Sequence, residues 1–377
     1  MIVLGFQEIV PLTAQQIVQT DPEKRRIWEN AVIETLDSRP SKKEDYILLR
    51  SEQLVGTALF VFVKSTLIGS IRNVEATTRK TGLRGMSGNK GAVGIRLEFF
   101  DTSFCFLTAH LAAGHANIEE RNADYRTIAN ELHFLKGKTI DSHDNVIWLA
   151  DTNYRVDLEN GLVRSLAESD DLDALVAADQ LRRAIDSRLA FVGYEEGPLL
   201  FRPTYRYDLQ STRYDTSEKM RIPAWTDRIL YKGSGLDLVV YSRAELLGSD
   251  HRPVFAIFRA EVRIIDTARR DALRRLLLDS VKATAPGEKL DEKLASMSLV
   301  NDSEDLPPPS SEEHSWWIDS DHPDGVYATD SLLNKIKDNA ATPTAPAPAP
   351  RKPPPPPPPS RNTKPTLISL DTDTNND

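Results

Sequence analysis

The chain has 377 residues, of which 40% are apolar, and its formal net charge is −9 at pH 7. Residues 300–377 carry 13 acidic and 6 basic side chains, so residues 1–299 have a net charge of only −2. A body this close to neutral excludes binding of bulk nucleic acid through a basic field over the whole surface.

The N-terminal stretch MIVLGFQEIV carries Glu8 and lacks the basic segment that opens a signal peptide. No window approaches 18 consecutive apolar residues, which argues against a transmembrane segment. The one cysteine, Cys105, lies inside an apolar run and cannot form an internal disulfide, which favours a reducing compartment. We therefore expect a soluble cytoplasmic protein.

Strands and helices are interspersed over roughly the first 260 residues. Residues 45–64 predict two adjacent strands, and residues 88–111 predict a hairpin that turns near Asp101, because both stretches are rich in Val, Ile, Phe and Thr. Residues 117–135 place apolar side chains at helical spacing as far as Leu135. Strand pairs with helices between them indicate an α+β sandwich, with sheets inside and helices outside.

The composition changes after residue 262. A helix is expected from about Asp266 to Lys282, within an extension that covers residues 263–299. Of the 24 prolines, 16 follow residue 300, so residues 300–377 form an acidic, proline-rich tail that cannot bury enough apolar area to fold. Residues 1–262 are the expected globular domain.

Polar side chains cluster where the predicted strands end. The stretch VIWLADTNYR (146–155) carries Asp151 and Asn153 to the rim of a sheet, and Glu8, His110 and Asp250 occupy similar places. Each alone has an ordinary explanation, since a lone histidine is usually a core residue bonded to the backbone and an aspartate is often a turn cap. Taken together, these carboxylate, amide and imidazole groups, without sulfur, suit a hard cation such as Mg²⁺.

Three other chemistries are disfavoured by the sequence. A cysteine phosphatase requires an arginine six residues after its cysteine, but Leu111 follows Cys105 at that spacing. The chain has no Gly-x4-Gly-Lys-Ser/Thr loop and no Gly-x-Ser-x-Gly elbow. His110 and His115 are not at helical i, i+4 spacing and have no sulfur partner, so zinc is a poor candidate.

Seven segments resemble, in chain order, the inositol polyphosphate 5-phosphatases, which are Mg²⁺-dependent members of the endonuclease/exonuclease/phosphatase superfamily: GFQEIV, GNKGAV, TAHLAAG, ADTNYR, PTYRYD, RIPAWTDRIL and SDHRPV. The stretches SEQLVG and YDTSEKMRIPAWTDR, with the proline-rich tail, are similar to the synaptojanin branch. The resemblance covers about residues 1–262. It implies a catalytic domain with a DNase I-like four-layer fold, in which two mixed β-sheets pack face to face with helices outside.

The resemblance implies a metal ligand and a base. Glu8 is expected to bind Mg²⁺, and Asp250 to lie at the metal or its waters. Asp151 is expected to orient and deprotonate the attacking water, with Asn153 beside it to hold water or a phosphate oxygen.

Three further residues are expected at the reacting phosphate. The resemblance implies that His251 donates to the scissile phosphate, that Asp227 pairs with His251 and keeps it cationic, and that His110 contacts the phosphate or the leaving oxygen.

The substrate inositol is expected to carry a second phosphate. By resemblance, Asn89 and Lys90 meet the phosphate that links inositol to glycerol. Four residues match the positions that grip the 4-phosphate: Tyr205, Arg206, Lys219 and Arg221. Arg206 replaces the usual lysine, which keeps the charge but adds a planar fork.

The sequence departs from the family pattern in two places. Ala150 and Thr152 flank the base where glycine and a larger apolar residue are usual. Family members also begin with a strand bearing WNxNG, whose Asn contacts the metal site, and this sequence starts just before IVLGFQEIV. We therefore expect a domain that lacks its first strand, with an exposed sheet edge.

The leading hypothesis is a Mg²⁺-dependent enzyme that removes the 5-phosphate of phosphatidylinositol 4,5-bisphosphate, peripheral at membranes and at endocytic sites. An alternative is an impaired adaptor whose tail, around Pro353–Pro359, binds SH3 domains or profilin. A third is a nuclease of the same superfamily, which the near-neutral body and the inositol-type segments disfavour, so no nucleic-acid partner is expected.

Overall fold

The sheets of this chain are stacked between helices. The structure, a computed structural model, describes residues 1–284 apart from residues 12, 14–15, 17–19 and 41. The proline-rich tail, with Pro353–Pro359, lies outside the described residues. No helix in the described part of the chain has the length and apolarity needed to cross a membrane. The unit Met1–Leu278 contains the fold that positions the site.

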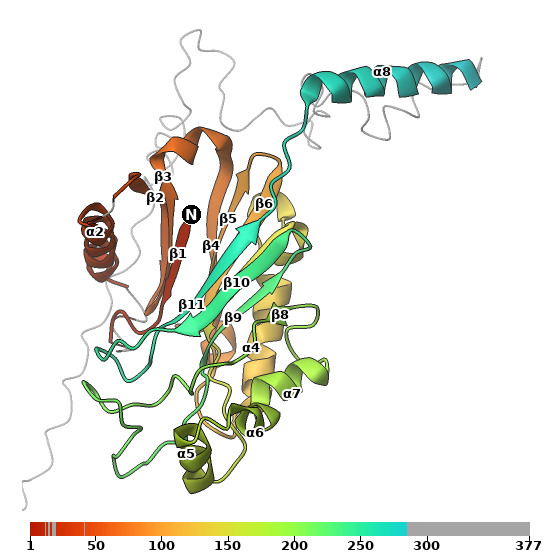
Figure 1. Ribbon diagram of the computed structural model, residues 1–377. Helices are drawn as coiled ribbons and strands as arrows, with labels where there is room; N and C mark the ends of the chain where they lie inside the picture. Colours follow the sequence, from red (N-terminus) through yellow and green to blue (C-terminus); the bar gives the residue numbers. More distant parts are fainter. Residues whose placement is uncertain (12, 14–15, 17–19, 41, 285–377) are drawn as a thin grey trace, which may run out of the picture. The chain divides into compact units, whose positions relative to one another are not determined.

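One layer is a six-stranded sheet in the order β4-β5-β6-β7-β9-β8 (Figure 1). Strands β6 and β7 pair in parallel, and the other neighbours pair antiparallel, so the sheet is mixed. Its strands are β4 (Ile71–Thr81), β5 (Ser87–Phe99), β6 (Thr102–His110), β7 (Asn145–Asp151), β8 (Glu195–Glu196) and β9 (Asp227–Lys232).

The facing layer consists of two antiparallel sheets. One has the order β1-β3-β2, and the other pairs β10 with β11. The apolar run of β3 is buried on both faces, because Leu59, Val61 and Val63 pack toward the six-stranded sheet while Phe60 and Phe62 pack the other way. The strands are β1 (Ile2–Phe6), β2 (Tyr46–Leu54), β3 (Thr57–Lys64), β10 (Leu236–Arg243) and β11 (Val254–Ala260).

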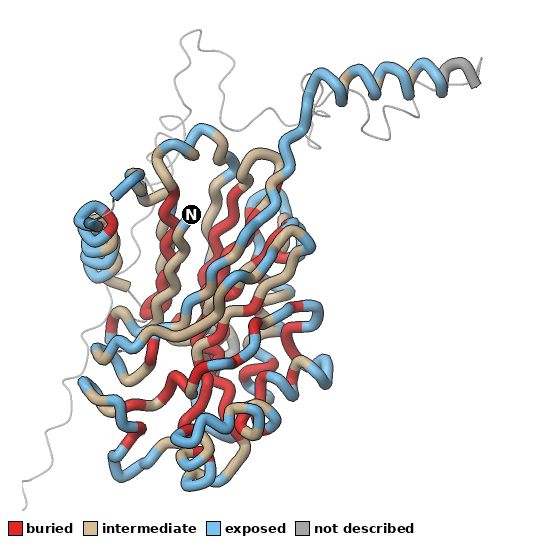
Figure 2. Tube along the Cα trace, in the orientation of Figure 1, coloured by how far each residue is buried: buried red, intermediate tan, exposed pale blue. Residues whose placement is uncertain are grey.

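Helices cover the outer faces of both layers. Helix α2 packs on β2 and β3 through Leu36, and α4 and α7 cover the six-stranded sheet through a cluster around Trp148 (Figures 1 and 2). Helices α5 and α6 contribute to a second cluster around Trp225. The α-helices are α2 (Glu23–Asp37), α3 (Gly82–Gly85), α4 (Ile118–Glu131), α5 (Asn160–Glu168), α6 (Leu172–Ala177), α7 (Gln180–Asp186) and α8 (Thr267–Thr284). Short 3-10 turns are η1 (Ser65–Ser70), η2 (Leu135–Gly137) and η3 (Ile140–Ser142).

The expected sandwich of sheets with helices outside is confirmed. The two adjacent strands expected at residues 45–64 are β2 and β3, and the expected hairpin is β5 and β6. The helix expected over residues 117–135 ends earlier, at Glu131. Leu132 turns into an extended conformation, and with Phe134 it packs against the backbone of Gly94 in β5, so tertiary packing ends the helix.

The sandwich is open between β1 and β11. Among the described strands, β1 pairs only with β3, and β11 only with β10. A cavity of about 1510 Å³ is lined by both strands and by core side chains of the six-stranded sheet, such as Phe106 and Leu149. The polar residues of the candidate site line part of the same cavity.

Candidate active site

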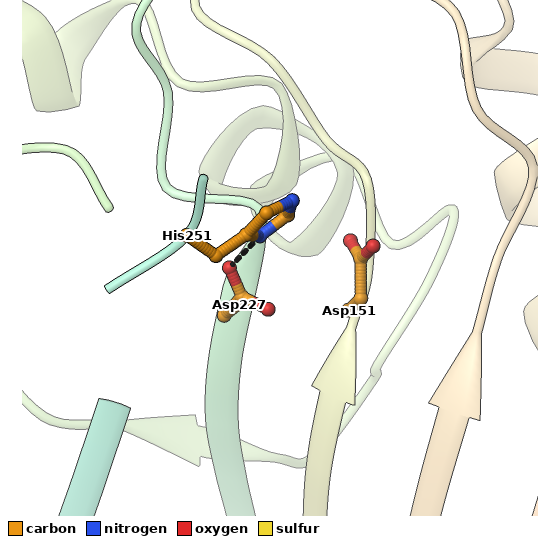
Figure 3. Close-up of side chains that lie close together, drawn as sticks. All are labelled: Asp151, Asp227 and His251. Carbon is orange, nitrogen blue, oxygen red and sulfur yellow. Dashed lines mark hydrogen bonds and ion pairs between the residues drawn. The ribbon is translucent and has the colours of Figure 1, made fainter. Parts of the chain in front are cut away.

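The register of the six-stranded sheet brings three polar side chains together. Asp151 ends β7, and Asp227 begins β9 directly opposite it. His110 ends β6 and is paired with Asp151 on the other side. His251 lies just before β11, and a backbone bridge to Tyr205 holds it beside them. Figure 3 shows Asp151, Asp227 and His251 facing a common space.

Asp151 is buried and tightly held. The backbone N–H of Asn153 donates to its Oδ1 (3.0 Å), and the Asn153 side-chain amide donates to its Oδ2 (3.1 Å). Asn153 has φ of 56°, a left-handed conformation that Asn tolerates better than most residues. Burial, with the charge of Asp227, raises the pKa of Asp151 to about 6. The carboxylate is therefore a base that is ionised at neutral pH yet close to its pKa.

Thr152, which stands where the family usually has a larger apolar residue, has hydrogen-bond partners for its buried polar groups. Its backbone N–H and its Oγ1 both donate to the carbonyl of Thr226, at 2.7 and 2.9 Å. The side chain is fully buried. These bonds tie the residue after the base to the residue before Asp227, so Thr152 helps to fix the distance between the two carboxylates.

Asp227 and His251 form an ion pair. Nδ1 of His251 donates to Oδ2 of Asp227 at 2.7 Å, and the hydroxyl of Thr226 donates to the same oxygen at 2.9 Å. Burial alone lowers the pKa of His251, but the charge and hydrogen bond of Asp227 outweigh it and raise the pKa to about 10. The imidazole is therefore cationic at neutral pH, with Nε2–H free to donate to an anion.

His110, unlike His251, is neutral at pH 7. Burial and the nearby Lys90 ammonium lower the pKa of His110 well below its ordinary value, so the ring is neutral. Its Nε2 lies 3.3 Å from Oδ2 of Asp151 and 4.0 Å from Oε1 of Glu8, and the Lys90 ammonium contacts it. Burial also lowers the pKa of Lys90. The two histidines of the site thus differ in protonation because burial and neighbouring cations dominate at His110, whereas the charge and hydrogen bond of Asp227 outweigh burial at His251.

Glu8 and Asp151 offer the oxygen donors for a divalent cation. Asp151 approaches His110 from the end of β7, and Glu8 approaches it from the turn that follows β1, where the Glu8 side chain is 67% exposed. Asp151, Asp227 and His251 also place one donor atom each within 4.8 Å of one another. His251 is a poor ligand, however, because it is cationic and its Nδ1 is engaged by Asp227. A carboxylate set with room for water fits a hard cation.

Asp250 and Arg206, one of the residues expected at the 4-phosphate, line a neighbouring hollow. Oδ2 of Asp250 lies 3.3 Å from Nη1 of Arg206, and both line a cavity of about 260 Å³ with Asp215. Nη1 of Arg221 lies 3.4 Å from Oδ2 of Asp215. Burial opposes ionisation of Asp215, but hydrogen bonds from Ser217 and Arg221 outweigh it and hold its pKa below the ordinary value.

The remaining expected substrate residues are separated. Lys90 and Asn89 are neighbours on β5 and point to opposite faces, so Lys90 reaches His110 while Asn89 lies against Gly82. The Asn89 Oδ1 has no hydrogen-bond partner among the described residues. Lys219 is exposed.

Sequence reasoning gave no role to three residues that hold the site. Arg155 donates to the Asn153 side chain, and Thr226 and Thr204 place hydroxyls beside Oδ2 of Asp227. Arg155 was visible as the cation two positions after Asn153 in ADTNYR, and Thr226 as the hydroxyl residue directly before Asp227. Their partners depend on how the loops meet, which the sequence pattern does not encode.

The layered sheets with helices outside, and the polar site at their rim, are of the DNase I-like type. The family described as Endonuclease/Exonuclease/phosphatase family 2 matches residues 1–257, and the chain belongs to this family. A crystal structure of the inositol polyphosphate 5-phosphatase domain of SPsynaptojanin, in complex with inositol (1,4)-bisphosphate and calcium ion, is 43% identical with a TM-score of 0.69, covering 78% of this chain and 82% of that one. Within the family, the chain therefore contains an inositol polyphosphate 5-phosphatase domain of the synaptojanin kind.

Curated relatives agree with this assignment. Inositol-1,4,5-trisphosphate 5-phosphatase 1 of Schizosaccharomyces pombe is 41% identical over 341 residues, which cover 85% of this chain and 31% of that protein. Polyphosphatidylinositol phosphatase INP53 of Saccharomyces cerevisiae is 44% identical over 310 residues, which cover 81% of this chain and 28% of that protein. The chain spans about a third of the length of these relatives.

Proposed function

We propose that this protein hydrolyses the 5-phosphate of phosphatidylinositol 4,5-bisphosphate with Mg²⁺ as cofactor. The observation that carries the proposal is the pairing of a basic carboxylate, Asp151, with a cationic donor, His251, across one space. The relatives named 5-phosphatases, and the related domain bound to an inositol that carries phosphates at positions 1 and 4, support the position of attack.

In the proposed reaction, Asp151 accepts a proton from a water molecule whose oxygen attacks phosphorus. The bond between phosphorus and the inositol oxygen breaks, and the inositol oxygen takes up a proton from solvent to leave as the hydroxyl, while Asp151 returns its proton to solvent. His251 donates from Nε2 to a phosphate oxygen, and neutral His110 contacts the phosphate or the leaving oxygen. Glu8 would hold Mg²⁺, with Asp250 at the metal or its waters, and the ion would supply charge neutralisation for the phosphate. No covalent intermediate is needed.

Asn153 and Asp227 act on the two central groups. Asn153 keeps the Asp151 carboxylate in place through two hydrogen bonds and offers its amide to the water or a phosphate oxygen. Asp227 keeps His251 protonated and oriented. Asp250, one residue before His251, is placed to reach the waters of the metal ion or to hold Arg206.

Substrate choice is assigned to cations around the site. Arg206, in the hollow beside Asp250, and Arg221, which pairs with Asp215 of that hollow, are proposed to bind the 4-phosphate together with Tyr205 and the exposed Lys219. Asn89 and Lys90 are proposed for the phosphate that links inositol to glycerol, and Lys90 would have to turn from His110 to reach it. The catalytic domain is proposed to cover residues 1–262, followed by the extension 263–299 and the tail 300–377.

The surroundings of the domain follow from the substrate. A lipid headgroup requires the protein to act at a membrane surface, and we propose that this surface is the cytoplasmic face of endocytic membranes. The tail around Pro353–Pro359 is proposed to bind SH3 domains or profilin, because a run of prolines adopts the extended helix that such domains recognise.

The test is phosphate release from vesicles that contain phosphatidylinositol 4,5-bisphosphate. The proposal expects release that requires added Mg²⁺, stops with EDTA, and is absent from vesicles that contain only the 4-monophosphate lipid. If the protein binds SH3 domains but releases no phosphate, the adaptor hypothesis is supported instead. If it nicks plasmid DNA, the hypothesis of a nuclease from the same superfamily is favoured.

A further inference from the structure

Arg155 is a buried cation at the centre of the site with no role in the proposed reaction so far. Its side chain is shielded from solvent, and only 8% of the residue is exposed. Nη2 donates to Oδ1 of Asn153 at 2.6 Å, and Nε donates to the backbone carbonyl of the same residue at 3.0 Å. The guanidinium is thus bonded twice to the residue that holds the base.

These contacts fix which way the Asn153 amide points. A guanidinium has only N–H donors, so the Asn153 atom that faces it must be the oxygen. The amide nitrogen then faces two acceptors, Oδ2 of Asp151 at 3.1 Å and the carbonyl of Leu111 at 3.2 Å. If the amide flipped, its oxygen would face both acceptors and its nitrogen would face the guanidinium, and all three hydrogen bonds would be lost.

The other face of the guanidinium reaches the opposite half of the site. It stacks over the ring of Tyr205, 4.4 Å from the centroid, and that ring lies 4.9 Å from the ring of His251. Backbone bonds between Tyr205 and Ala224 anchor this stack. Arg155 therefore contacts the residue that holds the base and the residue that packs on the phosphate donor.

We propose that Arg155 is a positioning residue that fixes the Asn153 amide against Asp151, with its stack on Tyr205 holding the guanidinium in place. The inference rests on the proposed function, since the base and the donor are those of that reaction. Arg155 acts through Asn153 rather than on the substrate. Its loss should therefore lower kcat while the affinity for the lipid is retained.

The experiment compares Arg155→Met with Arg155→Lys and places each in the wild type and in Asn153→Ala. A loosened catalytic group costs on the order of 100-fold, so we expect Arg155→Met to lower kcat by about 100-fold and to change KM by less than about 3-fold. Arg155→Lys keeps one donor and should recover roughly a tenth of the wild-type kcat. In the Asn153→Ala background, Arg155→Met should lower kcat by less than about 3-fold, because its partner is already absent.

A matched control is Arg96→Met, which removes another buried arginine whose bonds go to Glu75, Glu98 and His143, away from the site. It should lower the midpoint of thermal unfolding with kcat little changed. If Arg155→Met does not fold, Arg155→Lys with native unfolding and an unchanged kcat would overturn the inference.

The outcomes separate this inference from the proposed function. An equal loss of kcat from Arg155→Met in both backgrounds, or a change confined to KM, would overturn the positioning role while the wild type still released phosphate. A wild type that releases no phosphate would overturn the proposed function itself. A crystal structure of Arg155→Met adds a check without turnover, since the Asn153 side chain should leave Asp151.

Discussion

Replacing Asp227 with asparagine tests how the site keeps His251 cationic. In the wild type, Nδ1 of His251 lies 2.7 Å from the Asp227 carboxylate. Asparagine keeps an oxygen within reach of this nitrogen but removes the negative charge. The pKa of His251 is raised from 6.5 to about 10, and the charge and hydrogen bond of Asp227 are the largest contributions in that direction. At about 1.4 kcal/mol per pKa unit, the interactions that raise it outweigh burial by on the order of 5 kcal/mol.

Part of this stabilisation survives in the variant, because Asp151 and Asp250 also raise the pKa of His251. We expect Asp227→Asn to lower that pKa by roughly 2 units, to about 8. The phosphate donor would then lose its proton in mildly alkaline solution. At a pH about one unit above the new pKa, only about a tenth of the molecules keep the cationic imidazole.

The assay is kcat/KM for phosphate release as a function of pH, for the wild type and Asp227→Asn. The alkaline limb should move from near pH 10 to near pH 8, so the variant loses about 10-fold in kcat/KM between pH 7 and pH 9. Asp237→Asn is the matched control, since this carboxylate lies on β10 and pairs only with Arg259 at 3.6 Å among the described ion pairs. An unchanged alkaline limb in Asp227→Asn would refute the role given to the ion pair.

The other predictions concern the base, the substrate and stability. Asp151→Asn should lower kcat by about 10³-fold in phosphate release with a nearly unchanged unfolding midpoint, and a loss under 10-fold would remove Asp151 as the base. In the wild type, kcat/KM should fall as the pH drops below about 6, because protonation of Asp151 removes the base. The check is kcat/KM measured against pH at several Mg²⁺ concentrations, and a value that stays constant down to pH 5 would mean that bound metal has lowered the pKa of Asp151. Lys219→Ala should raise KM for the 4,5-bisphosphate lipid several-fold with kcat retained, and unchanged kinetics would place the 4-phosphate elsewhere. Because the pKa of His251 is raised in the folded state, protonated His251 stabilises the fold fully below pH 6.5, and this stabilisation is lost as the pH rises toward 10. The temperature midpoint of unfolding should therefore fall between pH 6.5 and pH 10, and it should fall less in Asp227→Asn.

The sequence predicted the layers of the fold because they depend on local patterns. The continuous apolar run of β3 is typical of a strand covered on both faces, and a stretch rich in Val, Ile, Phe and Thr with a turn near Asp101 predicted the hairpin of β5 and β6. The end of α4 was missed, because helical spacing continues to Leu135 while packing on Gly94 draws the chain away after Glu131.

The site could be predicted in part. The pattern of VIWLADTNYR placed Asp151 and Asn153 at a sheet rim from the residues alone, and the link between Asp227 and His251 came from resemblance. The register that sets Asp151 opposite Asp227 joins strands 76 residues apart and leaves no local signal. The same holds for Arg155, whose stacking on Tyr205 depends on where two loops meet.

The central claim is that water, activated by Asp151, attacks phosphorus at the 5-position. The most direct measurement is turnover of phosphatidylinositol 4,5-bisphosphate vesicles in H₂¹⁸O with Mg²⁺, followed by mass spectrometry of both products. The account predicts one ¹⁸O atom in each released phosphate and none in the lipid, with phosphatidylinositol 4-phosphate as the product. Label in the inositol ring, or release of the 4-phosphate in place of the 5-phosphate, would contradict it.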